Sequence, residues 1–597
     1  MTENRQPNPR ETYQDRIAAL TAQDARLHRQ HLLLGYVRLA LVIIAIVVAW
    51  FAFYRHTLSA WWLLAVAAAF VFVARRHSHV LQQRTEAQRA IRFFERGVAR
   101  IDDRWAELPT HDPGVSTTGS LFADDLDLFG NGGLFTLLTT ARTSLGEGTL
   151  ASWLFDPAGR DEILARQHAI EELRELADLR GELASCGRAD FERLDPSGLA
   201  AWATANEPRI AEWLRWLAPF LVALTIFAGV RYLITDHGLL LLVIVIIDAT
   251  ITFGMQKRTQ ALFVGAERVS DSLKLASVLI GQWEQREFSS PLLCRLHQSL
   301  QTKDQSASRA LARLASLARM MEQRGNFIVR VFDAPLLYSV QLAGAAQAWR
   351  GKHGGLLQQW LETLAHLEAL QSMATYSFEH PADPFPELID GDAQFNAEEL
   401  GHPLIAESKC VRNDVTLGGA SRLLLVSGSN MSGKSTLLRA VGINTVLAMA
   451  GAPVRAKRLR LTPLHIGASI RLNDSLQEGR SRFYSEILRL RAVCALAEDH
   501  PPVLFLLDEL LDGTNSSDRL MGARGIAQAL IASGAIGLIS THDLALTEIG
   551  ESIDALRNVH FEERIEDGEM NFDFKLRDGV VTTRNGVALM RMVGLKV

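Results

Sequence analysis

A glycine- and serine-rich segment with a lysine near its end has the composition of a loop that holds phosphate groups. It comprises Gly428, Ser429, Asn430, Met431, Ser432, Gly433, Lys434, Ser435 and Thr436. Glycines allow such a loop to turn its backbone N–H groups around a β-phosphate, while Lys434 supplies a positive charge to the β- and γ-phosphates. The Ser435 hydroxyl is placed to bind Mg²⁺. The segment therefore predicts binding of a nucleoside triphosphate with its magnesium ion, rather than a chance turn.

Two carboxylates follow an apolar run further along the chain. Val503–Leu507 is apolar and ends in Asp508 and Glu509. A buried central strand delivers acids in this way to the phosphate end of a sheet. We expect Asp508 to hold Mg²⁺, directly or through water, and Glu509 to orient or deprotonate the attacking water. His542 follows another apolar run, Ile536–Ile539, and is expected to donate a hydrogen bond to the γ-phosphate.

A sheet and a helix must position these groups, and the surrounding sequence predicts both. Leu423–Val426 is a short apolar run typical of a buried strand, and the residues after Lys434 start a helix. From about Gly401 onward strands and helices alternate, as in a parallel-sheet nucleotide domain. Residues 257–380 are helical and end before Pro381. The chain is therefore expected to have an all-α region followed by an α/β phosphate-loop domain.

Two pairs of apolar segments interrupt the helical region. Leu39–Tyr54 and Leu58–Ala74 carry no charge, and Leu217–Val230 and Gly238–Met255 form the second pair. A bilayer core needs about 20 apolar residues per helix, a length that the first segment reaches by running back to Leu32. Aromatic residues cluster at one end of the first pair, as at a membrane interface: Trp50, Tyr54, Trp61 and Trp62. We therefore predict two transmembrane helical hairpins.

Basic residues flank the outer ends of both pairs, whereas the two turns hold only Arg55 and Arg231. By the positive-inside rule the protein is then a multi-pass protein of the cell (inner) membrane whose large segments, including the nucleotide domain, are cytoplasmic. Asp248 lies near the middle of the fourth apolar segment, where a carboxylate costs a few kcal/mol. We expect it to be paired within the helix bundle, with Arg231 or Thr250, rather than to line an ion pathway.

The composition limits the classes of function. A chain of 597 residues is too long for one core, so two to four domains are expected. The net charge is -5, so binding to nucleic acid would need a local basic patch. The four cysteines lie far apart with no histidine pairing, which predicts buried thiols instead of disulfides or a zinc site. The first thirty residues are polar, so no cleavable signal peptide is expected.

Five motifs in a fixed order resemble those of the MutS family of ATPases, which belong to the ABC class. They are Gly401-His402-Pro403, the phosphate loop, the stretch Ser481–Glu486, the sequence LLDELLDGTNSSDR that begins at Leu506, and Ser540–His542. The resemblance is specific over residues 401–597, and Asn430-Met431 is its most diagnostic part. A weaker resemblance to the helical core and lever domain of MutS proteins covers residues 120–205 and 257–380.

The resemblance implies a homodimer, joined through the ATPase domains, with composite sites for ATP and Mg²⁺. In such ATPases the signature segment of one subunit caps the nucleotide held by the other, so Ser481 would reach the γ-phosphate in the partner. The Gly513–Ser516 loop would lie at the dimer interface. The expected fold is an α/β ATPase domain of ABC/MutS type, preceded by an all-α core and lever domain that carries the two transmembrane hairpins.

Six regions are expected in chain order. They are a polar N-terminal tail and helix (1–30), a first hairpin (31–76), a helical linker and core (77–210), a second hairpin (211–256), a continuation of the core and lever (257–385) and the ATPase domain (386–597).

Departures from the family pattern leave two functions open. The mismatch-reading domain has no counterpart, and the second hairpin stands where repair proteins insert the clamp that closes around DNA. The aromatic residue that stacks on adenine in relatives would fall near Cys410–Arg412, where none is present, so the base contact is open. One hypothesis is a membrane-anchored ATPase that acts on DNA, in mismatch repair or by binding a DNA structure, through ATP-driven dimer closure. The other is a mechanochemical membrane ATPase that moves a protein partner without nucleic acid.

Overall fold

The N-terminal part of the chain forms a long antiparallel hairpin. It consists of α1 (Pro9–Ala49), a π-helical turn (Trp50–Tyr54) and α2 (Trp62–Ile101). At a rise of 1.5 Å per residue each helix is about 60 Å long, roughly twice the thickness of a bilayer core. The apolar half of the hairpin is its tip. The charged half, residues 9–31 and 77–101, continues the same two helices, and we call it the stalk.

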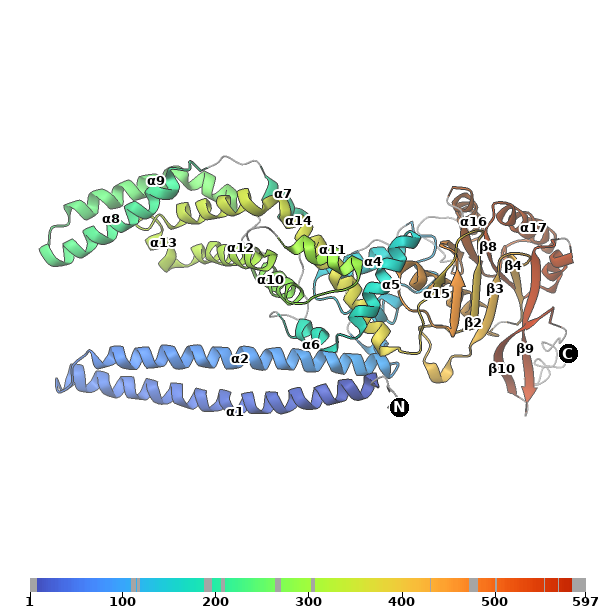
Figure 1. The fold of residues 1–597 in the computed structure, drawn as a ribbon, viewed down its shortest axis with the longest axis horizontal. Helices are drawn as coiled ribbons and strands as arrows, with labels where there is room; N and C mark the ends of the chain where they lie inside the picture. Colours follow the sequence, from blue (N-terminus) through green and yellow to red (C-terminus); the bar gives the residue numbers. More distant parts are fainter. Residues whose placement is uncertain are drawn as a thin grey trace.

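The molecule is elongated, with both helical hairpins extending from one end and an α/β region at the other (Figure 1). The computed structural model describes residues 8–108, 114, 119–186, 196–205, 210–263, 270–301, 306–429, 431–471, 482–499, 502–551, 553–566 and 569–581. The second hairpin consists of α8 (Leu214–Thr235) and α9 (Leu239–Phe263). Its tip points the same way as the first tip, away from the α/β region (Figure 1). In the described chain four helices, α1 with its π-helical turn, α2, α8 and α9, are long and apolar enough to cross a membrane.

Asp248 is buried between the helices of the second hairpin, but its partner differs from the two that we expected. The Thr225 hydroxyl donates a hydrogen bond to Asp248 Oδ2 at 2.8 Å. Thr250 instead donates to the carbonyl of Ile246 on its own helix. The reason is geometric, because the antiparallel turn brings Thr225 opposite Asp248, whereas Arg231 lies closer to the turn.

The helical region between the hairpins and the sheet is organised around one long helix, α14 (Tyr338–Glu379), of 42 residues. It packs against several shorter helices and against the second hairpin. The shorter helices are η2 (Trp105–Glu107), α3 (Leu134–Leu138), α4 (Ser144–Phe155), α5 (Arg160–Arg174), α6 (Ala177–Ser185), α7 (Pro196–Thr204), α10 (Ser270–Glu284), α11 (Pro291–Leu300), α12 (Ala307–Glu322), η4 (Gln323–Gly325) and α13 (Phe327–Asp333). A single hydrophobic core runs from this region into the sheet.

The C-terminal end of α14 also holds the stalk. Both oxygens of Glu379 accept hydrogen bonds from the Arg100 guanidinium, each at 2.7 Å, and both side chains are buried. The Tyr13 hydroxyl donates to the same carboxylate at 3.2 Å. Because α14 contacts α8 and α9 near its other end, one helix connects the two hairpins.

The C-terminal region contains two sheets. The larger has the order β10-β9-β4-β8-β7-β6, parallel from β9 to β6, and the smaller has the order β1-β5-β2-β3. The strands are β1 (Glu387–Leu388), β2 (Phe395–Leu400), β3 (Asn413–Leu417), β4 (Leu423–Ser427), β5 (Arg458–Leu461), β6 (His465–Ser469), β7 (Val503–Leu507), β8 (Ile536–Thr541), β9 (Leu556–Glu566) and β10 (Glu569–Asp578). The helices are η5 (Glu407–Lys409), α15 (Lys434–Ala450), α16 (Arg482–Asp499), α17 (Ser516–Ala532) and η6 (Leu544–Glu551). The prediction of a helical region followed by a parallel α/β domain is confirmed, but the smaller, mostly antiparallel sheet was not foreseen.

The four cysteines are free thiols, as predicted, but only Cys186 is fully buried. In the described part of the chain no group of three or more histidine, cysteine, aspartate or glutamate side chains could hold a metal ion by itself.

Candidate nucleotide site

The phosphate loop lies between a buried strand and the start of a helix. Strand β4 is buried along its whole length, and α15 begins at Lys434. Gly428 and Gly433 have φ angles of 153° and 105°, in the region that favours glycine. A Cβ at Gly433 would also lie only 3.1 Å from the ring of Phe574. The path of the loop therefore requires glycine at both positions.

The other residues expected in the loop occupy different environments. Met431 has a φ of 75° and is 85% exposed, so its side chain lies at the surface. Ser432 is buried, and its hydroxyl has no hydrogen-bond partner among the described residues. Ser435 and Thr436 lie half-buried and exposed on the first turn of α15. Two expected site residues, Asn430 and Ser481, lie outside the described residues.

Lys434 is buried and directed back along its own loop. Its Nζ donates hydrogen bonds to the carbonyls of Gly428 at 2.9 Å and Ser429 at 2.8 Å. Burial lowers the pKa of the ammonium, while the nearby carboxylates of Glu509 and Asp508 oppose this shift. The charge of Lys434 is thus fixed at the centre of the loop, where a β-phosphate would be an additional acceptor.

The three residues expected after strands β7 and β8 lie close together. The strands are neighbours in the sheet, so their carboxyl ends meet at one edge. The Ser540 hydroxyl donates to Asp508, and the backbone N–H of Glu509 donates to Ser540 Oγ at 3.1 Å. His542 Nδ1 lies 3.4 Å from Glu509 Oε1. Glu509 has a φ of 49°, a strained conformation that turns the chain sharply after β7.

The turn after Glu509 is held by α16, the helix that begins within the Ser481–Glu486 motif. Glu486, buried on α16, accepts a hydrogen bond from the backbone N–H of Leu511 at 2.6 Å. A cavity of about 110 Å³ is lined by Asp508, Glu509, Glu486 and Asp512, among others. Carboxylate and hydroxyl oxygens suit Mg²⁺, which is usually bound through one or two carboxylates plus substrate phosphates. Asp508 and Ser435 fit that role, because no complete protein cage is needed.

A second cavity, of about 200 Å³, lies beside Gly433 and Thr436 and is largely apolar. Its walls include Phe561 and Phe574, both from the C-terminal β9–β10 hairpin. Phe574 has a φ of 53° at an irregularity in β10, and its carbonyl accepts a hydrogen bond from Asn413 at 2.9 Å. An aromatic wall therefore lies beside the phosphate loop, but it comes from a distant segment and not from Cys410–Arg412.

Two further side chains lie at this site: Glu563 was not found from the sequence, and His402 was found there only as part of a motif, with no role assigned. Glu563 on β9 accepts a hydrogen bond from the Ser429 hydroxyl, so it lies against the phosphate loop. His402, from the Gly-His-Pro motif, lines the apolar cavity, and burial lowers its pKa to about 4. This histidine is therefore neutral at physiological pH. The alternation of aromatic residues at Phe572 and Phe574 was the available signal in the sequence for this apolar cavity.

A comparison with known families decides what this region is. The profile of the family described as MutS domain V matches residues 424–596. This part of the chain belongs to the MutS domain V family. Over 247 residues the chain is 34% identical to the DNA mismatch repair protein MutS 2 of Halobacterium salinarum, covering 40% of this chain and 28% of that protein. It is 31% identical to the DNA mismatch repair protein MutS of Brevibacillus brevis over 274 residues, 45% of this chain and 31% of that protein.

The chain thus spans less than a third of the length of these relatives. Within it, the MutS domain V is joined to the helical region through a buried aspartate before α3. Asp125 accepts hydrogen bonds from the backbone N–H of Ile470 at 2.8 Å and from Arg489 of α16 at 2.7 Å. Arg439 of α15 donates to the carbonyl of Asp125 at 3.0 Å. Helices α15 and α16, which border the nucleotide site, therefore both contact the helical region at Asp125.

Proposed function

We propose that this chain is an ATPase that uses Mg²⁺. Lys434 and the loop from Gly428 to Ser435 hold the phosphates, and Asp508 and Ser435 hold the metal ion, which neutralises charge on the β- and γ-phosphates when bound. Glu509 orients or deprotonates the attacking water, and His542 donates a hydrogen bond to the γ-phosphate. The observation that carries this proposal is the 3.4 Å separation of His542 and Glu509 at the sheet edge.

Hydrolysis on this proposal occurs in a homodimer. Ser481 of one subunit would complete the site of the other, as the motif order of the MutS domain V supports. Phe574 and the apolar cavity beside Gly433 would hold adenine.

The two apolar hairpins are proposed to anchor the protein in the cell membrane, with the MutS domain V in the cytoplasm. Both tips point the same way, so a single bilayer could receive them together (Figure 1). The aromatic residues expected at the interface are exposed at the tip of the first hairpin: Trp50, Tyr54, Trp61 and Trp62. On α13, Phe327 and Phe332 are also exposed, at 77% and 53%, which suits a helix that touches lipid.

We propose that ATP hydrolysis drives movement of these hairpins or of a partner bound to them. The argument rests on α14, which contacts the second hairpin near one end and holds the stalk at the other through Glu379 and Arg100. Closure of the ATPase dimer would shift α14 and, with it, both hairpins. The moved partner on this proposal is a protein in or beside the membrane.

A second candidate function is action on DNA. It is favoured by the relatives named DNA mismatch repair proteins, although their similarity covers under half of this chain. Phosphate contacts release counterions, so true DNA binding must weaken as salt rises. Binding of the detergent-solubilised protein to duplex and branched DNA, measured between 50 and about 300 mM salt, separates the two functions. A salt-dependent, nanomolar affinity would favour the DNA function over the mechanochemical one.

The proposed function is tested on protein that stays with membranes after a carbonate wash and is then reconstituted into lipid nanodiscs. We expect Mg²⁺-dependent ATP hydrolysis that rises with the number of subunits per disc. Lys434→Ala should abolish it, while Lys457→Ala, at an exposed lysine of the same domain, should leave it unchanged. Release of the protein by carbonate would contradict the anchoring, and hydrolysis that survives Lys434→Ala would contradict the site.

A further inference from the structure

Two histidines face each other across the first hairpin, at the boundary between the stalk and the apolar tip. His31 is the last stalk residue of α1, and His77 is the first stalk residue of α2. Nδ1 of His31 lies 2.7 Å from Nε2 of His77, and the two ring centroids are 4.8 Å apart. His77 is buried and His31 is half-buried. The two imidazoles therefore form a direct polar contact between the helices.

Arg38, in the apolar half of α1, fixes where the protons of this pair lie. Its Nη1 is 3.0 Å from Nδ1 of His77. A guanidinium only donates hydrogen bonds, so Nδ1 of His77 accepts, and the proton of this neutral ring is on Nε2. Nε2 of His77 then donates to Nδ1 of His31, whose own proton is also on Nε2. The chain of hydrogen bonds from Arg38 through His77 to His31 thus requires both histidines to be neutral.

The two helices of the hairpin supply no negative charge near the pair. Residues 25–85 contain neither aspartate nor glutamate. His28 lies one turn before His31 on α1, and their ring centroids are 6.2 Å apart. On α2 the residues before His77, Arg75 and Arg76, are exposed and basic. An added proton on either histidine would therefore meet positive or neutral neighbours.

The nearest acids lie further from the apolar tip. Arg84 donates a hydrogen bond to Asp24 at 3.1 Å, seven residues along each helix from the histidine pair, which is about 10 Å. Helix α6 packs on α2 and brings Asp178 and Glu182 to a cavity beside Gln83 of the stalk. In the part of the chain that the structure describes, neither His31 nor His77 contacts a carboxylate.

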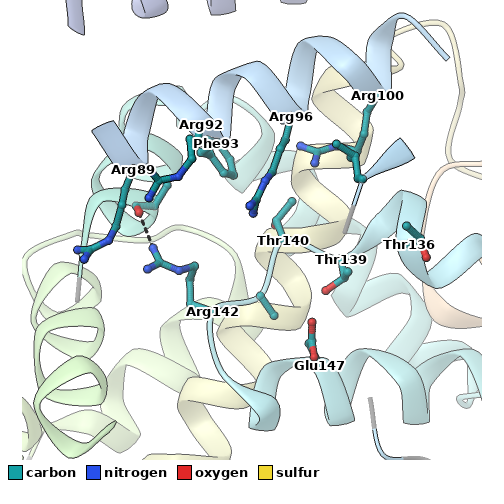
Figure 2. A pocket seen from close by; sticks show the side chains of 13 residues that line it. Arg89, Arg92, Phe93, Arg96, Arg100, Thr136, Thr139, Thr140, Arg142 and Glu147 are labelled. Atoms are coloured by element: carbon teal, nitrogen blue, oxygen red, sulfur yellow. Dashed lines mark hydrogen bonds between the residues drawn. The ribbon is translucent and has the colours of Figure 1, made fainter. Parts of the chain in front are cut away.

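The other end of the stalk is fixed to the helical region. Side chains of α2 between Arg89 and Arg100 point towards the segment around Thr140 that precedes α4 (Figure 2). Arg100 is also bonded to Glu379 of α14. At the boundary with the apolar tip, by contrast, the described contacts of the histidine pair come from α1 and α2 alone. A change at the pair would therefore move the tip end of the stalk while its other end stays in place.

We propose that the hydrogen-bond chain Arg38–His77–His31 is a pH-sensitive contact, which lets α1 and α2 separate at the end of the stalk in mildly acidic conditions. A histidine free of such contacts gains a proton near pH 6.5. A proton added to His31 would place two N–H groups against each other, and one added to His77 would face the Arg38 donor and its charge. The paired state thus binds fewer protons than the separated state, so the contact weakens as pH falls below about 6.5. The contact itself does not rest on the proposed function, whereas its effect on movement of the hairpin does.

The test measures the distance between the two helices in the full-length protein, reconstituted into lipid nanodiscs. Gln30→Cys and Ser78→Cys place spin labels at exposed positions beside the pair, in a parent protein whose four native cysteines are replaced by serine. Double electron–electron resonance then gives the distance distribution at several pH values between about 7.5 and about 5.5. We expect a narrow distribution at the upper end, and a longer and broader one at the lower end.

Two matched pairs of substitutions separate this contact from a general effect of pH. His31→Gln with His77→Gln leaves no titratable ring, yet each amide can accept one hydrogen bond and donate another, so the chain from Arg38 can persist. We expect the same distance distribution at all pH values in this variant. His28→Gln with His79→Gln removes two exposed histidines from the same helices and should keep the change seen in the parent.

A distance distribution that does not change with pH in the parent would overturn the proposal. So would a change of the same size in the variant that lacks His31 and His77. Arg38→Gln keeps the proposal testable if that variant folds poorly, because it retains a donor but removes the positive charge beside His77. We expect its transition about half a pH unit or more above that of the parent. A transition at the same pH as in the parent would show that Arg38 does not act on the pair, against the proposal.

Discussion

Arg489 on α16 donates a hydrogen bond to the buried carboxylate of Asp125 at 2.7 Å, which joins the MutS domain V to the helical region. Asp125 is only 2% exposed and also accepts from the backbone N–H groups of Ile470 and Arg471, at 2.8 and 2.5 Å. The same helix carries Glu486, which holds the turn after Glu509. Asp125 therefore connects the helical region to the turn that carries the proposed general base.

We predict that Asp125→Asn destabilises the protein and weakens this connection. The amide has the same shape, but its NH₂ cannot accept the hydrogen bonds that one carboxylate oxygen now accepts. The expected loss in the free energy of unfolding is about 1.5 to 3 kcal/mol, the range for hydrogen bonds to a charged group. It is measured by chemical denaturation of the full-length protein. Asp127→Asn, which removes a more exposed partner of Arg471, should cost far less.

Phe574 is predicted to contribute to ATP affinity through its ring. Stacking of a base on an aromatic side chain is worth about 1 to 3 kcal/mol, so Phe574→Ala should weaken ATP binding about fivefold or more. Phe574→Tyr keeps the ring and should retain affinity. Binding of a fluorescent ATP analogue measures both variants. An unchanged affinity in Phe574→Ala would place the base somewhere other than the cavity beside Gly433.

The stability of the protein is predicted to depend on pH through two buried glutamates. Burial raises the pKa of Glu147 to about 8 and that of Glu368 to about 7. An unfolded glutamate loses its proton near pH 4.3, so the folded form holds more protons between these values. The wild type therefore loses stability as pH rises from about 4 to about 8.

Replacing Glu147 with glutamine removes one of these titrations. We expect the melting temperature of Glu147→Gln, relative to that of the wild type, to increase from pH 5.5 to pH 8.5. Thermal denaturation at several pH values measures the difference. Glu171→Gln removes one charge from an exposed position on α5 and should show no such trend. A constant difference for Glu147→Gln across this range would contradict a proton held by Glu147.

The sequence predicted where the locally encoded residues of the candidate site lie, although their roles stay predictions. The phosphate loop and the residues Asp508, Glu509 and His542 each follow a short apolar strand, so local spacing predicted their positions at the sheet edge. Adjacent parallel strands then bring the acids and the histidine together. Predicting the positions of these residues required no knowledge of contacts between distant segments.

Contacts between distant segments explain what the sequence did not reveal. Phe574 reaches the apolar cavity beside Gly433 because β10 is irregular there and Asn413, 161 positions away in sequence, holds its backbone. Thr225 pairs with Asp248 because the antiparallel hairpin brings α8 and α9 side by side. Such pairings leave no signal in the local spacing of residues along the chain.

The central claim is that Glu509 completes a site that hydrolyses ATP, and Glu509→Gln tests it most directly. Removing a general base lowers turnover by about a hundredfold or more, while the amide leaves the shape of the site and its phosphate contacts intact. Steady-state hydrolysis and retained nucleotide are measured together, with Mg²⁺ present, on full-length protein. We predict turnover at least about a hundredfold below the wild type, with ATP retained in a stable dimer. Normal turnover in Glu509→Gln would contradict the claim.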